Sequence, residues 1–415
     1  MLFRIPLFLF FLVGILALFG FKTSRAEAAN SLEKRLARAV TVTNLNPKQT
    51  AALVIDGQTG KVIFSRNPST SLVPASNEKI PIAFAALSVL GPSYRTQTAL
   101  LGRGIQKGAI WKGHLVLKGF GDPGLHTNDL QRLVKRLEAR GIRHVTGRII
   151  GDESFFDDKR TAPGWKASFY KLWSPPLSAL IVNRAFFRGR TVDKPAAAAA
   201  RAFQAELEAA GITVRLNAKA GRINEKRATS IASVQSPTIE QLVKFMNTES
   251  DNFTAEMLLK LLGAHVRGKG TTAAGAKVVR RVLRNAGVSL EGVRIVDGSG
   301  LSSSDRLTTQ SVVDIIVAAR NLPEIWPPFK KSLAIAGVSG TLKDRMKNKP
   351  ALRSVRAKTG TTNLSSALSG IIKDRYIFSI IMNGTYVPWW RTRPAQDRFA
   401  TILARMAQQE SKSHY

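Results

Sequence analysis

The sequence predicts a mixed α+β fold, in which an antiparallel sheet flanked by helices carries a smaller inserted α+β subdomain. Strand-like segments lie near residues 51–65 and again after 354, with amphipathic helical segments between them. The stretch 94–234 combines short strands with a basic helix and an Ala-rich helix. With 415 residues and 44% hydrophobic content, the chain can build more than one core. We therefore expect a main domain from 29–93 and 235–415, and an inserted subdomain at 94–234.

The first residues predict export. Arg4 supplies a basic region, residues 5–21 form an uncharged apolar run, and Ala26-Glu27-Ala28 is the small-x-small pattern that signal peptidase reads. We expect residues 1–28 to be a signal peptide and the protein to act in the periplasm or at the cell wall. The apolar run is almost long enough to span a bilayer, so an uncleaved leader that associates with the membrane is the alternative.

A hairpin and a helix are expected to follow the leader. Strand-like segments at 51–55 and 61–65 are separated by an Asp-Gly-Gln-Thr-Gly turn, which predicts a β-hairpin. Apolar residues at helical spacing predict a helix over 76–90, which ends at a Gly-Pro pair. Ser76 is the expected N-cap of this helix, and Glu78 lies in its first turn, where the helix dipole favours an acid.

The remaining elements follow from periodicity and capping signals. The inserted stretch should contain strands at 113–117 and 147–150 and helices at 128–140 and 195–210. A Ser-Pro-Thr-Ile-Glu capping signature at 236–240 opens a helical region that runs to about 266. The other expected elements are helices at 271–286, 309–320 and 396–409, and strands at 367–372 and 376–382.

The composition limits the chemistry. The chain contains no cysteine, which excludes thiolate zinc sites, thiol nucleophiles and disulfides. Its five histidines form no close pair, so we expect neither a metal site nor a cofactor. The 62 Lys and Arg outnumber the 28 Asp and Glu, a balance that also suits nucleic-acid binding. An exported chain meets little nucleic acid and no such motif is present, so anionic wall or envelope polymers are the expected partners.

The first chemical motif is Ser76-Asn77-Glu78-Lys79, an S-x-x-K sequence. Residues three apart share one face of a helix, so the Lys79 amine can reach the Ser76 hydroxyl and take its proton. The same spacing occurs at Ser31 to Lys34 and at Ser168 to Lys171. Only Ser76 follows a hairpin, opens a strongly apolar helix and precedes the next two motifs.

Two further motifs follow in order. Ser250-Asp251-Asn252 lies at a break between helical stretches, where side chains can project into a cleft. Lys358-Thr359-Gly360-Thr361 is the single K-T-G of the chain and lies at a strand end, where the glycine permits close approach of a ligand. Individually, the three motifs read as a capped helix, a polar turn and a strand end. Their order and their surrounding elements favour one shared active site.

This set of motifs resembles the penicillin-recognising serine acyl-transferases. Finer matches resemble the D-alanyl-D-alanine carboxypeptidase/endopeptidase family, the class C low-molecular-mass penicillin-binding proteins, over nearly the whole mature chain. The matching segments are Gly-Phe-Gly-Asp-Pro at 119–123, Ala-Pro-Gly-Trp at 162–165, Asp-Gly-Ser-Gly-Leu-Ser at 297–302 and Ala-Gly-Val-Ser-Gly-Thr-Leu at 336–342. The resemblance implies a penicillin-binding, transpeptidase-like catalytic domain.

The resemblance also implies roles for the motif residues. Ser76 would attack the carbonyl between two D-configured residues of a peptidoglycan stem peptide, with Lys79 as general base, and form an acyl-enzyme. Ser250 would relay a proton to the leaving amine, and Asn252 would hold the substrate amide. Lys358 would raise the positive potential, keep Lys79 neutral and attract the substrate carboxylate. Penicillin and other β-lactams would inhibit the enzyme covalently.

The third motif would also supply the oxyanion hole, formed by the backbone N–H groups of Ser76 and Thr361. Thr359 and Gly360 belong to the same substrate-binding strand.

Two departures from the family pattern concern substrate recognition. A second insertion found in many members is missing near 183–195, which predicts an open cleft that admits cross-linked peptides. After Asp-Gly-Ser-Gly-Leu-Ser, where members that hold a diaminoacid carry an arginine, this chain has Ser303, with Arg306 three residues later. Asp152 stands where the family's amine-binding acid would be. We expect Asp152 and Arg306 to contact the substrate and varied third residues of the stem to be tolerated.

Two other functions compete with the serine D,D-peptidase prediction. A β-lactamase or esterase of the same fold would need an added base that the sequence does not locate. A wall-binding module with a decayed active site would not need intact motifs, yet all three motifs are intact here. Whether carboxypeptidase or endopeptidase activity dominates is left open.

Overall fold

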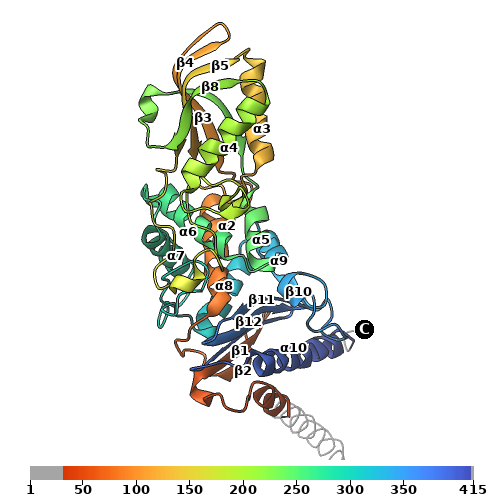
Figure 1. Ribbon diagram of the computed structural model, residues 1–415. Coiled ribbons are helices and arrows are strands. Elements are labelled where there is room, and N and C mark those ends of the chain that lie inside the picture. The colour runs from red at the N-terminus through yellow and green to blue at the C-terminus, as the bar shows by residue number, and fades with distance from the viewer. Residues whose placement is uncertain (1–30, 413–415) are drawn as a thin grey trace, which may run out of the picture.

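The computed structural model describes residues 31–412 of the chain. Figure 1 shows an elongated molecule with one sheet at each end and helices between them. The predicted mixed α+β fold, with a sheet flanked by helices and a smaller inserted part, is confirmed. The predicted signal peptide at 1–28 lies outside the described residues. Across 31–412, no helix is both long and apolar enough to cross a membrane.

The larger sheet joins the two ends of the chain. It is fully antiparallel, and its strand order is β10-β11-β12-β13-β1-β2. The predicted hairpin therefore pairs with the last strand of the chain. The strands are β1 (Thr50–Asp56), β2 (Val62–Arg66), β10 (Ala334–Ile335), β11 (Val355–Thr361), β12 (Ser365–Ile372) and β13 (Tyr376–Asn383).

Helices cover both faces of this sheet. Every residue of β12 and β13 is buried, which requires apolar partners on both sides. On one face, Ile377 and Ile381 pack in the core that contains α2 (Lys79–Leu90) and α8 (Thr309–Arg320). On the other face, Leu368 and Phe378 pack with α10 (Trp389–Lys412). Figure 1 shows α8 and α10 on opposite sides of the strands.

Further helices surround α2. The predicted helical region at 236–266 is two helices, α5 (Ile239–Thr248) and α6 (Asn252–Arg267), because the chain breaks at the second motif. The helices α7 (Thr272–Asn285) and α8 agree with the sequence prediction. A short helix that the sequence did not predict, α9 (Trp326–Ser332), begins at a Trp-Pro-Pro sequence. Residues 31–39 form one more helix, which packs on α10 through Leu36.

The smaller sheet forms the other end of the molecule. Its order is β8-β5-β4-β3-β9, with the pairs β4–β5 and β5–β8 parallel. Two helices, α3 (Thr127–Ala139) and α4 (Pro195–Ala209), pack on one face. The strands are β3 (Gln97–Lys107), β4 (Ile110–Gly119), β5 (His144–Asp152), β8 (Thr213–Ala220) and β9 (Thr229–Gln235), and a two-residue pair, β6 (Phe186–Phe187) and β7 (Arg190–Thr191), lies apart from it.

One segment of the inserted stretch returns to the main core. Phe156 forms a bridge with Gly270, and Leu177 and Ile181 are buried among residues of α2 and α6. All five strands of the smaller sheet lie between 97 and 235. Phe156, Leu177 and Ile181 pack in the helical centre, whereas Leu180 and Val182 pack in the core of the smaller sheet. The division into 29–93, 94–234 and 235–415 therefore remains a prediction. It agrees least well with the packing of this segment, which it places in the inserted subdomain.

Candidate active site

Ser76 lies in a 3₁₀ turn, Ala75–Glu78, immediately before α2. The predicted N-cap role of Ser76 is wrong: α2 begins at Lys79, and the turn has no side-chain cap hydrogen bond. Ala75 adopts a φ of 48°, which turns the chain sharply into the helix. Because the Ser76 hydroxyl caps no backbone amide, it is available to Lys79.

Lys79 is fully buried and makes three hydrogen-bond contacts. Its Nζ lies 3.0 Å from Ser76 Oγ, 2.8 Å from Asn252 Oδ1 and 2.6 Å from the Ser299 carbonyl oxygen. A neutral amine can donate to the two carbonyl oxygens and keep its lone pair for the Ser76 proton. Burial lowers the pKa of Lys79 to about 8, although nearby carboxylates oppose the shift. The arrangement therefore supplies a base at Ser76 near neutral pH.

The second motif occupies the break between α5 and α6. Ser250 has a φ of 60°, and Asp251 caps α6 by accepting a hydrogen bond of 2.7 Å from the Thr254 amide. Arg184 pairs with Asp251 at 2.7 Å and fixes the corner. Asn252 uses both ends of its amide: Oδ1 accepts from Lys79, and Nδ2 donates to the Trp173 carbonyl oxygen at 3.0 Å.

The third motif lies on the edge of β11. Lys358 is fully buried, and its Nζ donates to Ser250 Oγ and to the Thr359 carbonyl oxygen, both at 2.9 Å. Burial, together with the nearby charge of Lys79, holds the pKa of Lys358 well below its usual value. Strand β10 pairs only with Arg356 and Ala357, so β11 from Lys358 onward has no strand on that side.

The three motifs meet in one cavity of about 420 Å³. Lys79 and Lys358 form hydrogen bonds to side chains that line this cavity. The cavity therefore combines a nucleophile, a base, a second hydroxyl and an open strand edge. Its lining residues are Ser76, Trp173, Glu249, Ser250, Asn252, Gly300, Leu301, Thr341, Arg345, Thr359, Thr361, Thr362 and Arg393.

Gly360 lies against the turn that carries Ser76. A Cβ atom at this position would lie 2.9 Å from the Pro74 carbonyl oxygen. The glycine therefore lets the Ser76 turn approach β11, and its contact with a ligand stays a prediction.

The loop after α7 positions the carbonyl oxygen that Lys79 contacts. Asp297 accepts hydrogen bonds from the Gly300 amide at 2.7 Å and from the Trp165 indole at 2.8 Å. Glu256, on α6, accepts from the Ser299 amide at 2.8 Å. The sequence match at 297–302 did not reveal this positioning role.

Buried acids lie behind Lys79. Burial, reinforced by the charge of Asp297, raises the pKa of Glu78 well above its usual value and that of Glu256 to about 8. The pKa of Asp305 is likewise raised well above normal by burial and Asp297. Both carboxyl oxygens of Glu78 are buried without a hydrogen-bond partner. These groups are therefore held toward their neutral forms.

Two residues expected at the substrate lie elsewhere. Asp152 is fully buried at the end of β5, where its carboxylate accepts from the Ser154 and Ile223 amides and pairs with Lys118 at 3.4 Å. Arg306 donates to the carbonyl oxygens of Ser303 and Asp305, each at 2.7 Å. Neither residue lines the cavity that contains Ser76. The structure thus brings together the three motifs but not Asp152 and Arg306.

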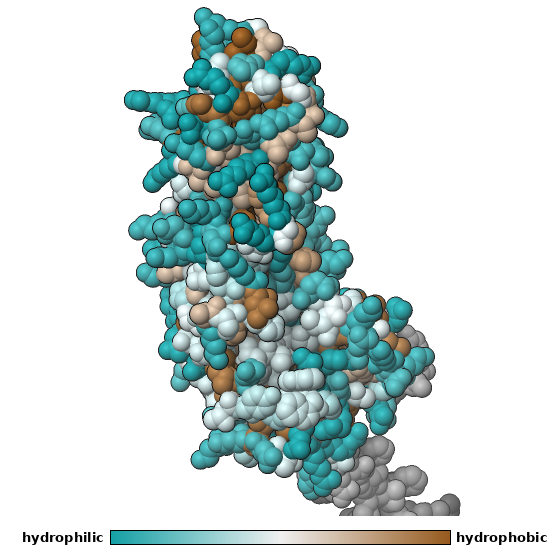
Figure 2. All heavy atoms as spheres, viewed as in Figure 1, coloured by the Kyte–Doolittle hydropathy of each residue, from teal (hydrophilic) through white to brown (hydrophobic). Residues whose placement is uncertain are grey.

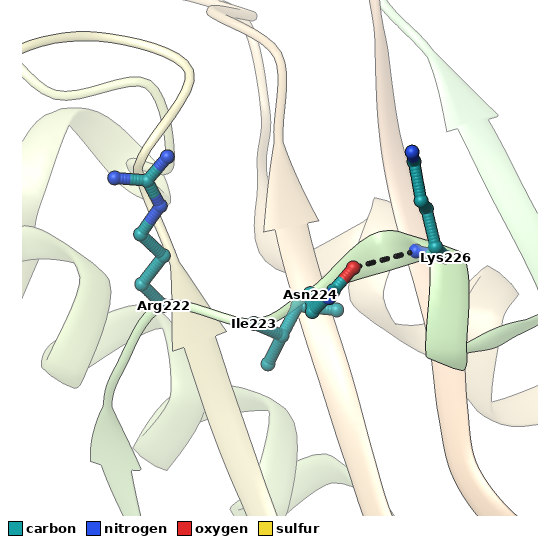
Figure 3. A pocket seen from close by; sticks show the side chains of 4 residues that line it. All are labelled: Arg222, Ile223, Asn224 and Lys226. Carbon is teal, nitrogen blue, oxygen red and sulfur yellow. Dashed lines mark hydrogen bonds between the residues drawn. The ribbon is translucent and has the colours of Figure 1, made fainter.

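Another cavity, of about 540 Å³, lies beyond β8 and is lined by Arg222, Ile223, Asn224 and Lys226. Figure 3 shows the Arg222 and Lys226 side chains extending from this loop, with the Asn224 side chain accepting from the Lys226 amide at 3.1 Å. The cavity has basic groups but no nucleophile or general base, so it offers no second catalytic site.

Comparison with known proteins identifies the family. The model of the D-Ala-D-Ala carboxypeptidase 3 (S13) family matches residues 32–191 and 184–406. The chain belongs to this family. It is 31% identical to a D-alanyl-D-alanine carboxypeptidase of Actinomadura sp. (strain R39), over 86% of this chain and 81% of that protein. It is also 31% identical to carboxypeptidase DacB of Mycolicibacterium smegmatis, over 84% and 79%.

Solved structures show the same fold. Penicillin-binding protein 4 of Haemophilus influenzae aligns with a TM-score of 0.78 at 20% identity, over 91% of this chain and 99% of that one. A predatory peptidoglycan endopeptidase of Bdellovibrio bacteriovorus aligns with a TM-score of 0.58 at 16% identity, over 89% and 94%. The predicted resemblance and fold are confirmed, as is the assignment to a serine-type carboxypeptidase family.

Proposed function

We propose that the chain is an exported serine D,D-peptidase that cleaves D-alanyl bonds of peptidoglycan stem peptides through an acyl-enzyme on Ser76. The observation that carries the proposal is the 3.0 Å contact between Ser76 Oγ and the buried Lys79 Nζ. The cavity that contains Ser76 is also lined by Ser250, whose hydroxyl accepts a hydrogen bond from Lys358. Family membership supports the substrate class.

Acylation begins with neutral Lys79. Its lone pair takes the Ser76 proton as Oγ bonds to the carbonyl carbon, and the developing oxyanion is stabilised by the Ser76 and Thr361 N–H groups. When the C–N bond breaks, the Ser250 hydroxyl gives its proton to the leaving amine and takes one from protonated Lys79, so the net transfer runs from Ser76 to that nitrogen and Lys79 is neutral again. Water then attacks the ester carbonyl and gives a proton to Lys79, which passes it to Ser76 Oγ as the ester C–O bond breaks.

Cross-linked peptides are proposed as substrates beside free stem ends. The missing second insertion near 183–195 supports a cleft open enough for a branched leaving group. The name of the Bdellovibrio structure, a peptidoglycan endopeptidase, is in line with this idea. If dimeric muropeptides are cut at least as fast as pentapeptides, the open cleft is supported, whereas trimming of pentapeptides alone contradicts it.

Anionic wall or envelope polymers are proposed as further partners. The formal net charge is +34, and Figure 2 shows hydrophilic side chains over most of one face, from one sheet to the other. The net positive charge should attract polyanions over about 10 Å at 0.1 M salt. Binding to isolated sacculi should therefore weaken steeply as salt rises to about 0.5 M. Salt-independent binding would contradict this partner.

Covalent labelling by penicillin tests the central proposal. The full chain should gain one penicillin mass, and peptide mapping should place it on Ser76. Ser76→Ala should remove the label. Ser168→Ala is the matched control, because Ser168 begins another S-x-x-K whose Lys171 instead pairs with Asp193 at 2.8 Å. A label that persists in Ser76→Ala, or moves with Ser168, refutes the assignment.

A β-lactamase of the same fold is the second candidate, because Glu249 lines the cavity and is a carboxylate that could activate water. A chromogenic cephalosporin separates the two functions. A peptidase is acylated once and then stalls, while a β-lactamase turns over continuously.

A further inference from the structure

Arg393 lies on the first turns of α10 and lines the catalytic cavity. Its Nη2 donates to Thr361 Oγ1 at 3.3 Å, and its guanidinium carbon lies 4.8 Å from the centre of the Trp389 ring. The cation–π contact with the indole restricts the position of the guanidinium. A rigid cation is therefore positioned beside the residue that ends the third motif.

A second arginine of the same cavity provides a contrast. Arg345 already binds a carboxylate, Asp397, at 2.7 Å, and it also donates to the Gln396 side chain at 3.2 Å. Among the residues that the structure describes, no carboxylate pairs with Arg393. Several of its donors are thus not matched by protein acceptors, although the group is partly withdrawn from solvent.

We propose that Arg393 binds the carboxylate of the residue on the leaving side of the scissile bond, and so makes the enzyme selective for a free carboxylate over a carboxamide there. This inference rests on the proposed peptidase function and names a specificity-determining residue for it.

The geometry of the reaction places that carboxylate near Arg393. The leaving nitrogen must lie close to Ser250, and the carboxylate carbon of the leaving residue is only two bonds from this nitrogen. On β11, Thr359 and Thr361 point to the same side, because side chains alternate along a strand, and both line the cavity. A carboxylate held at these hydroxyls lies next to the guanidinium that already contacts Thr361.

Lys358 is less suited to this task. Its Nζ is already committed to Ser250 and to the Thr359 carbonyl oxygen, and burial and the charge of Lys79 hold its pKa well below the usual value. An arginine keeps its charge at every working pH, and its planar fork matches both oxygens of a carboxylate. Arg393 therefore lines this cavity, keeps its positive charge and has no carboxylate partner within 31–412.

The test compares two acyl-D-alanyl-D-alanine peptides that differ only in a free or an amidated C-terminus. Arg393→Gln should lower kcat/KM for the free acid by about 30- to 100-fold, mostly through KM, because the contact exists in the ground state and the transition state. The value for the amide should change by less than about three-fold. Arg393→Lys, which keeps the charge but not the fork, should lower the acid rate by about ten-fold.

Arg391→Gln is the matched control, because Arg391 is exposed on the same helix and does not line the cavity. It should leave both rates unchanged. Equal losses on acid and amide in Arg393→Gln, or no loss on either, overturn the inference while the peptidase function stands. A wild-type enzyme that cleaves neither peptide and takes no penicillin label overturns the proposed function together with this inference.

A second measurement keeps the inference testable if the Arg393→Gln variant folds poorly. The acylation rate of Arg393→Lys by a β-lactam free acid and by its methyl ester is followed by intact mass. Slower acylation by the acid alone supports carboxylate recognition, and equal slowing by both contradicts it.

Discussion

The two ends of the molecule bury charge in opposite ways. In the smaller sheet, Lys118 and Asp152 are buried as an ion pair, and backbone amides complete the shell of the carboxylate. Around the larger sheet, Lys79 and Lys358 are buried with no carboxylate at ion-pair distance anywhere in 31–412. Glu78, behind them, has no hydrogen-bond partner at either carboxyl oxygen.

The pKa values differ accordingly. Burial alone would raise the pKa of Asp152, but hydrogen bonds from Ser154 and Ile223 and the charge of Lys118 leave it below its usual value. Burial without a carboxylate at ion-pair distance lowers the pKa of Lys79 to about 8. Burial and the charge of Asp297 raise the pKa of Glu256 to about 8, despite hydrogen bonds from the Gly298 and Ser299 amides. A buried charge that is paired with an opposite charge maintains structure. A buried group without such a partner has its pKa shifted into the pH range where it can exchange protons.

Removing the unpaired lysine should have the largest effect. Lys79→Met keeps the side-chain volume but removes the base, so the rate of acylation by penicillin should fall by about 10³-fold. The melting temperature should not fall, because an unpaired buried amine is lost. Intact-mass kinetics and thermal unfolding measure both results. Lys171→Met, in another described S-x-x-K, is the control, and a Lys79→Met enzyme that is still acylated rapidly would refute the base assignment.

Breaking the buried ion pair of Lys118 and Asp152 should lower stability and leave activity unchanged. Lys118→Met leaves the Asp152 carboxylate buried without its cation, so the free energy of unfolding should fall by about 3–5 kcal/mol. The acylation rate of the folded fraction should stay within about two-fold, because this pair lies outside the catalytic cavity. Denaturant unfolding and penicillin labelling distinguish the two effects. A variant of normal stability but low activity would contradict the comparison.

Sequence reasoning succeeded where neighbours along the chain decide the structure. The hairpin β1–β2 and helices α3, α4, α7 and α8 follow from turn chemistry and periodicity, and the motifs carry their order in the chain itself. It did not predict β3, which continues through Gly102 and Gly104. It also placed the start of the last helix near 396, because Pro394 lies inside the first turns of α10.

The catalytic cavity shows the same limit. Ser76, Ser250, Asn252 and Thr361 were found because each belongs to a motif. Trp173 and Arg393 were missed, since each enters the cavity only when a distant segment folds back onto the motif residues. Asp152 was expected to contact the substrate because it stands where the family's amine-binding acid would be. Its position in the sequence does not show that the Lys118 amine already pairs with its carboxylate.

The unpaired lysine should also set the pH dependence of the reaction. Only the neutral form of Lys79 can take the Ser76 proton, and its pKa is about 8. The acylation rate should therefore rise about ten-fold per pH unit on the acid side and level off above about pH 8. Stopped-flow acylation between pH 5 and 10 measures this limb. A flat profile would show that Lys79 is not the titrating base.

The smallest expected effect concerns the stability of the buried acids. The pKa of Glu256 is raised from 4.5 to about 8, so its neutral form stabilises the fold at low pH and this stability is lost as the pH rises from about 4.5 through 8. Glu256→Gln cannot ionise, and its Oε1 can still accept from the Gly298 and Ser299 amides. Relative to wild type, the variant should therefore gain a few degrees in melting temperature between pH 5 and pH 9. Asp152→Asn should show the opposite trend at lower pH: relative to wild type it should lose stability as the pH rises toward about 4 and then stay constant from pH 5 to pH 9, because the pKa of Asp152 is lowered from 3.8 and its stabilising effect is complete above that value. Parallel curves for Glu256→Gln and wild type would mean that this carboxyl does not titrate in the folded protein, and the contrast between the two ends of the molecule would then rest on the lysines alone.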